Sequence, residues 1–126
     1  KLLHVLSVPL SEQIFTEFGE DFARVPDLDH DGIDELLVGA PSHDGGNDES
    51  VHTDRGKVYL FSGRTGERLG CMFGDRDEGE LGMEVLGLPD LDGDGVAEFL
   101  CGAVKHGLAG GSYVEAAVYS GARMLD

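Results

Sequence analysis

The chain has 126 residues, the length of one ordinary domain, with 25 acidic against 9 basic residues and a formal net charge of −16. This balance excludes a nucleic-acid-binding role, because no basic stripe is available to neutralise phosphates, and it disfavours an anionic membrane surface. No apolar run is long enough for a transmembrane helix, so membrane insertion is not expected either. Twenty glycines and the absence of tryptophan point to short strands and tight turns.

Short apolar segments separated by polar turns follow one another through the first half of the chain. The segment 35–39 is almost entirely apolar, which is typical of a strand that is covered on both faces. Residues 10–16 could form one helical turn, but the β-prone Ile14 and Phe15 favour an irregular connection. The predicted strands of this half span residues 1–8, 18–25, 35–39, 56–61 and 67–73.

The second half of the chain repeats this plan. Its predicted strands span residues 81–86, 98–102 and 112–119, and a fourth is expected to begin just before Asp126. Four strands in each unit of about 60 residues, without a helix, are typical of β-propeller blades. We therefore expect an all-β fold with two repeats of about 63 residues, each a blade of four antiparallel strands. The expected divisions are 1–17 (outer strand of a neighbouring blade plus a connection), 18–73 (first blade) and 74–126 (second blade, with an incomplete outer strand).

An acidic loop lies between the first two predicted strands of each unit. The loop 27–35 and its later copy, 90–98, share the pattern Asp-x-Asp-x-Asp-Gly-x-x-Glu. Oxygen ligands at alternate positions can converge on one hard cation, and the glycine permits the sharp turn around it. A carbonyl at position 7 and a carboxylate at position 9 complete a shell that suits Ca²⁺ better than Mg²⁺. The predicted ligands, for about two Ca²⁺ per chain, are Asp27, Asp29, Asp31, Ile33 (carbonyl) and Glu35, and Asp90, Asp92, Asp94, Val96 (carbonyl) and Glu98.

Two other interpretations of these loops fit the sequence less well. An EF-hand requires a glutamate at position 12, where this chain has Val38 and Cys101, and the apolar run after each loop favours a buried strand over an exiting helix. Solvated Asp-Gly turns without a metal are a second interpretation, which the repetition of the pattern disfavours.

Histidines and cysteines offer weaker signals. The polar segment 41–55 contains His43 and His52, which with Asp44 or Asp54 could recruit a transition metal, although isolated histidines in such a segment are usually solvated. Cys71 and Cys101 lie in apolar runs, where a free thiol behaves as a small hydrophobe, and the sequence leaves a disulfide between them open.

The two units resemble the FG-GAP repeats of integrin alpha-subunit β-propellers and their bacterial relatives. The residues that carry the resemblance are Phe18-Gly19, the loop 27–35 and Gly39-Ala40-Pro41, and Leu81-Gly82, the loop 90–98 and Gly102-Ala103-Val104. The chain departs from the family in having Glu at the ninth loop position, where Asp is usual, and the second unit lacks the Phe and the Pro.

The resemblance implies that each loop binds Ca²⁺ on one face of a propeller, while partners bind the opposite face. It also implies an extracellular or cell-surface location. We therefore expect a non-catalytic, calcium-binding module for extracellular adhesion, protein interaction or scaffolding, in which the segment 41–55 is a candidate for contacts with a protein ligand. No ligand-binding motif of the family is present, and no catalytic residue is assigned.

Two alternatives stay open on the sequence. One is a propeller portion, catalytic or not, of a secreted hydrolase or lyase, although neither Gly-x-Ser-x-Gly nor His-Glu-x-x-His occurs. The other is a purely structural repeat with no ligand but Ca²⁺.

Two blades cannot close a ring, since propellers have about four to eight. The expected partners are therefore the remaining blades of a parent protein, of which this chain is a piece, or further copies in a homo-oligomer. In the second case residues 1–8 of one copy would complete the last blade of another.

Overall fold

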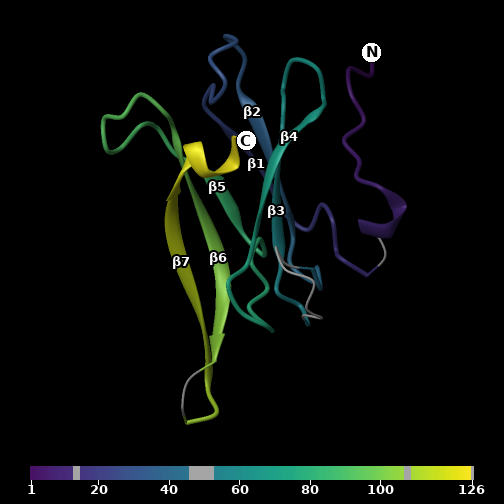
Figure 1. The fold of residues 1–126 in the computed structure, drawn as a ribbon, viewed down its shortest axis with the longest axis vertical. Coiled ribbons are helices and arrows are strands. Elements are labelled where there is room, and N and C mark those ends of the chain that lie inside the picture. Colours follow the sequence, from purple (N-terminus) through teal and green to yellow (C-terminus); the bar gives the residue numbers. More distant parts are fainter. Residues whose placement is uncertain (13–14, 46–52, 107–108, 126) are drawn as a thin grey trace.

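A computed structural model describes residues 1–12, 15–45, 53–106 and 109–125 as two antiparallel sheets (Figure 1). The first sheet, here called blade 1, has the strand order β1-β2-β3-β4, and the second, blade 2, has the order β5-β6-β7. The all-β fold and the two-unit organisation are confirmed. The strands are β1 (Phe22–Val25), β2 (Glu35–Ala40), β3 (Lys57–Phe61), β4 (Arg68–Phe73), β5 (Val85–Gly87), β6 (Glu98–His106) and β7 (Ser112–Ser120).

The first strand of each blade begins later than predicted, because a turn precedes it. Gly19 and Gly82 have φ of +93° and +97°, a conformation that favours glycine. Their amides donate to Gly39 and Gly102 in the second strands, at 2.9 and 3.2 Å. The two blades thus share the same turn at equivalent positions of the repeat.

Both ends of the chain differ from the prediction. Residues 1–9 form no strand, and a 3₁₀ turn, η1 (Leu10–Glu12), follows them. Where a fourth strand of blade 2 was expected to begin, the chain forms a second 3₁₀ turn, η2 (Gly121–Met124), capped by the Ser120 side chain, which accepts a hydrogen bond from the Ala122 amide. Met124 is fully buried and packs against β4, which holds η2 between the blades. The predicted domain boundaries stay predictions.

One apolar core lies between the blades. Leu37, Val58 and Leu60 of blade 1 face Phe99 and Cys101 of blade 2. Their sheets approach so closely that a Cβ on Gly87 would stand 2.0 Å from the carbonyl oxygen of Arg24. A backbone contact of this kind requires glycine, and it fixes the position of blade 2 on blade 1.

The other face of blade 1 carries a second, smaller core, which the N-terminal segment covers (Figure 1). Val8 is buried there against Val38 and Tyr59, and the ring of Phe18 meets the ring of Tyr59 edge-on, with 5.4 Å between the centroids. Residues 1–5 lie outside this contact and are exposed.

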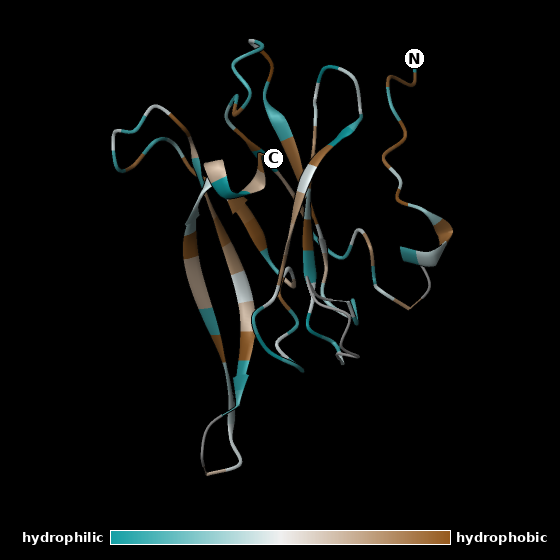
Figure 2. Cartoon of the chain, viewed as in Figure 1, coloured by the Kyte–Doolittle hydropathy of each residue, from teal (hydrophilic) through white to brown (hydrophobic). Residues whose placement is uncertain are grey.

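The strands of blade 2 carry several hydrophobic residues (Figure 2), and some of these are open to solvent on its outer face. Leu86, Val114 and Val118 are each more than half exposed, and the strand register places Leu86 and Val118 on either side of Leu100. No helix in the described residues is long and apolar enough to cross a membrane.

Candidate metal centres

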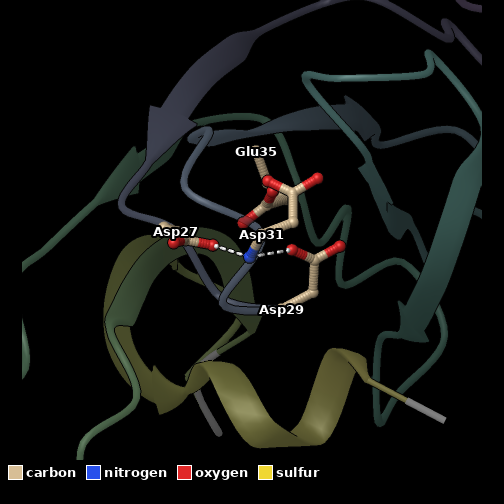
Figure 3. A group of neighbouring side chains, drawn as sticks. All are labelled: Asp27, Asp29, Asp31 and Glu35. Carbon is tan, nitrogen blue, oxygen red and sulfur yellow. Dashed lines mark hydrogen bonds between the residues drawn. The ribbon is translucent and has the colours of Figure 1, made fainter.

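The loop between β1 and β2 is closed by hydrogen bonds from its own amides to its aspartates. The two carboxylate oxygens of Asp27 accept from the amides of Asp31 and Gly32, at 3.0 and 2.8 Å. Asp29 accepts from the same Asp31 amide at 3.1 Å. Gly32, with φ of +88°, provides the sharp turn. Figure 3 shows the two bonds from the Asp31 amide, and the carboxylates of Asp27, Asp29, Asp31 and Glu35 gathered in one place.

The loop between β5 and β6 repeats this arrangement. Asp90 accepts from the amide of Gly95 at 2.9 Å, and Asp94 accepts from that of Val96 at 2.8 Å. Gly95, with φ of +91°, is the counterpart of Gly32. The structure therefore brings the predicted acids of each loop together. The two groups are Asp27, Asp29, Asp31 and Glu35, and Asp90, Asp92, Asp94 and Glu98; within each, one oxygen of every carboxylate lies within 4.8 Å of the others.

The glutamate at the ninth position of each loop is buried at the start of a strand. Glu35 is fully buried in β2, and Glu98 is 4% exposed in β6. One oxygen of each accepts a backbone hydrogen bond, from Leu28 in the first loop and from Leu91 in the second. The other oxygen, Oε1, is buried in both residues without a hydrogen-bond partner. Burying an unpaired carboxylate oxygen is costly, and a bound cation would supply the missing partner.

The pKa of the Glu35 carboxyl is raised, first by burial and then by the negative charges of Asp29, Asp27 and Asp31. The hydrogen bond from the Leu28 amide opposes this shift. A divalent cation at the centre of the four carboxylates would remove the repulsion. The donor set, which consists of oxygens alone, fits a hard cation such as Ca²⁺. Ile33 and Val96 lie in their loops as expected, and the use of their carbonyl oxygens stays a prediction.

The first loop has a contact that the sequence reasoning did not identify. Arg64, in the turn between β3 and β4, donates from Nε to Asp31 Oδ2 at 2.8 Å and from Nη2 to the Asp31 carbonyl oxygen at 2.6 Å. The repeated Ser-Gly pair could have indicated that this turn contacts the loop. Gly63 packs against the carbonyl oxygen of Asp34, and Gly121 packs against that of Ala97. Arginine follows this pair only in the first unit.

The weaker metal prediction at the histidines is not supported for His43. This residue is buried, its ring meets that of Phe73 edge-on, and its Nδ1 accepts a hydrogen bond from the Gly45 amide at 2.9 Å. Its pKa is lowered, first by burial and then by Lys57. Among the described residues, His43 belongs to no group that could hold a metal. His52 lies outside the described residues.

The cysteines are both free. Burial raises the pKa of the Cys101 thiol to about 12, so this thiol is protonated and unreactive at neutral pH. It packs as a small apolar residue in the core between the blades.

Comparison with known proteins gives a consistent result. Residues 18–61 match the FG-GAP repeat family. The chain is 35% identical to integrin alpha-PS2 of Drosophila melanogaster over 104 residues, 30% identical to integrin alpha-5 of Xenopus laevis over 108, and 34% identical to integrin alpha-V of Gallus gallus over 101. These matches cover 72–79% of this chain, which spans only 7–9% of the length of those relatives.

Proposed function

Since the chain belongs to the FG-GAP repeat family, we propose that it is a non-catalytic β-propeller module whose two acidic loops each bind one Ca²⁺. The observation that carries this proposal is the unpartnered, buried Oε1 of Glu35 and of Glu98, each beside three aspartates. The proposed ligands are Asp27, Asp29, Asp31, Glu35 and the Ile33 carbonyl, and Asp90, Asp92, Asp94, Glu98 and the Val96 carbonyl.

The role of Ca²⁺ follows from where the loops lie. Each loop joins the first two strands of its blade, and its glutamate belongs to the second strand. An ion held by the aspartates and the glutamate ties the loop to the buried sheet. The unfolded chain has no such site, so Ca²⁺ binding stabilises the folded state. At Ca²⁺ concentrations above Kd, the stabilisation grows with the logarithm of the concentration divided by Kd.

The role in adhesion comes from the relatives, which are integrin alpha chains. We place the protein outside the cell or at its surface, in adhesion, protein interaction or scaffolding. The segment 41–55 lies between β2 and β3 in the sequence, and we propose it as the contact for a protein ligand.

The partners that complete the propeller are proposed from the repeat. Leu36 and Val38 of blade 1 correspond to Phe99 and Cys101 of blade 2, which pack on blade 1. The Leu36 face is therefore equivalent to a surface that contacts a preceding blade, and the outer face of blade 2 to one that contacts a following blade. Further blades of the same polypeptide or of other copies would cover the outer face of blade 2 and the part of the Leu36 face that the N-terminal segment leaves open. Light scattering tests the second option, which expects a discrete oligomer with an even number of blades and is contradicted by a stable monomer.

Calorimetric titration with Ca²⁺ after chelator treatment tests the main proposal. We expect about two sites per chain and a rise in melting temperature on binding. The double variant Asp29→Ala with Asp92→Ala should lose both effects. The matched control is Glu20→Ala with Glu67→Ala, which removes two exposed acids outside the loops. If the loop variant binds Ca²⁺ like the wild type, the assignment is wrong.

A further inference from the structure

A small cavity lies between the blades, and no residue of either acidic loop lines it. Its volume is about 100 Å³, and it is bounded by the end of β4, the facing side of β6 and β7, and η2. Three basic side chains line it, Arg55, Lys105 and Arg123, against one acid, Asp75. The chain has nine basic residues and a net charge of −16, so the convergence of three of them on one cavity is unexpected.

Two of these basic groups form only long ion pairs with carboxylates of the protein. Lys105 Nζ lies 3.7 Å from Asp75 Oδ1 and 3.6 Å from Glu115 Oε1, and Arg55 Nη2 lies 3.6 Å from Asp77 Oδ1. These separations exceed ordinary hydrogen-bond length. The side chains of Lys105 and Arg55 are only 11% and 16% exposed, so water screens their charges weakly.

Arg55 also has a donor without an acceptor. Its Nε is buried and has no hydrogen-bond partner. A buried N–H group without an acceptor costs free energy, especially on a charged group. Arg123 has its guanidinium 5.3 Å from the centroid of the Tyr119 ring, a cation–π contact that leaves its N–H groups available. Arg55, whose Nε lacks an acceptor, and Arg123 both line the cavity together with Lys105.

We propose that this interblade cavity binds one small tetrahedral oxyanion, sulfate or phosphate, held by Arg55, Lys105 and Arg123. The cavity, with a volume of about 100 Å³, has room for one such ion. Guanidinium groups present paired donors that match the oxygens of these anions, and lysine adds a point charge. Asp75 at the cavity opposes the anion, so the expected affinity is millimolar.

The bound anion would connect the blades. Arg55 lies two residues before the start of β3 in blade 1, whereas Lys105 lies in β6 and Arg123 in η2. An ion that accepts from both sides joins the two sheets at the point where their apolar core gives way to polar residues. This site does not depend on the Ca²⁺ proposal, because none of its residues belongs to an acidic loop.

Isothermal titration with sodium sulfate, exchanged against sodium chloride at constant ionic strength, tests the site in the calcium-loaded chain. We expect one saturable site per chain. Lys105→Met and, separately, Arg123→Gln should each weaken binding at least tenfold. Arg123 is exposed, so its variant keeps the test valid if Lys105→Met does not fold. The control Arg68→Gln removes a positive charge paired with Glu12 outside the cavity and should bind sulfate like the wild type.

A repeat with phosphate in chelator, where calcium phosphate cannot precipitate, shows which anion is preferred and separates this site from the Ca²⁺ sites. Absence of saturable binding of both anions would overturn the proposal. Equal affinity in the wild type, Lys105→Met and Arg123→Gln would also overturn it. A rise in melting temperature that is linear in sulfate and equal in all variants would reflect general salt exclusion and would count against the site.

Discussion

Gly39 and Gly82 touch across the interface between the blades: a Cβ on Gly39 would stand 2.0 Å from the carbonyl oxygen of Gly82. Gly102 is the counterpart of Gly39 in blade 2. A Cβ at Gly102 would have its nearest neighbour, the Glu84 Cβ, at 3.4 Å, an ordinary contact distance. Gly39 and Gly102 occupy equivalent positions in their blades. The space around them differs because blade 2 covers Gly39, whereas no further blade in the described residues covers Gly102.

Gly39→Ala should therefore destabilise the chain by about 2–4 kcal/mol, because the backbone of one blade must move away from the other. Gly102→Ala should change stability by less than about 1 kcal/mol, since the added Cβ meets only ordinary contacts and alanine costs less backbone entropy than glycine in a strand. Urea unfolding in saturating Ca²⁺ measures both. Equal effects of the two substitutions would contradict the interface described here. In an assembled ring, where a following blade covers blade 2, Gly102→Ala should also weaken association.

Substitution of either loop glutamate should remove one Ca²⁺ site and leave the other. Glu35→Gln keeps an oxygen for the Leu28 amide but removes the charge that a cation needs, and Glu98→Gln does the same beside Leu91. Each variant should bind one Ca²⁺ where the wild type binds two, and the double variant none. Calorimetric stoichiometry is the measurement. A variant that still binds two ions with unchanged affinity would remove its glutamate from the proposed ligand set.

In the presence of a chelator, the stability of the protein should depend on pH through the Glu35 carboxyl. Its pKa is raised above the ordinary 4.5, so the folded chain holds this proton more tightly than the unfolded chain. The resulting stabilisation is fully present below pH 4.5 and is lost as pH rises through the raised pKa. In chelator, Glu35→Gln should therefore gain stability relative to the wild type as pH increases from about 4.5 to about 7. Denaturation across this range measures the difference, and a constant difference would contradict the shift.

The local features of this fold could be predicted from the sequence, whereas the contacts between distant segments could not. The apolar run after each loop predicted β2 and most of β6, and the aspartate spacing predicted which acids meet. The predicted strand 98–102 was too short, because a charged residue such as Lys105 is not typical of a buried strand. In the structure β6 continues to His106, and Lys105 lines the cavity between the sheets. The pairing of Glu12 with Lys57, 45 residues apart, has no signature in composition or spacing.

That pairing anchors the N-terminal segment on blade 1. Glu12 accepts from Lys57 Nζ at 2.7 Å and from the Tyr59 hydroxyl at 2.9 Å, and Lys57 is 4% exposed between the rings of Tyr59 and Phe73. Glu12→Gln should cost about 1–3 kcal/mol, because it leaves a buried ammonium without its counter-charge while the Glu12 side chain is itself partly exposed. Arg68→Gln, which breaks a longer and more exposed pair with Glu12, should cost less than about 1 kcal/mol. Chemical denaturation measures both, and equal costs would contradict a special role for Lys57.

Arg64 distinguishes the two loops, and its removal should change their calcium affinities unequally. Its guanidinium binds Asp31 Oδ2 and the Asp31 carbonyl oxygen, so it both occupies a proposed ligand and repels a divalent cation. The contact also preorganises the loop, but the half-exposed arginine contributes little to stability there. Arg64→Gln should therefore increase the affinity of the first loop about two- to tenfold.

Blade 2 has Ala122 after its Ser-Gly pair, where blade 1 has Arg64, so the affinity of the second loop should not change. Titration of Arg64→Gln in the Glu98→Gln background isolates the first loop, and the Glu35→Gln background isolates the second. Weaker binding by the first loop after Arg64→Gln would show that the arginine contributes more by positioning Asp31 than it loses by repelling the ion.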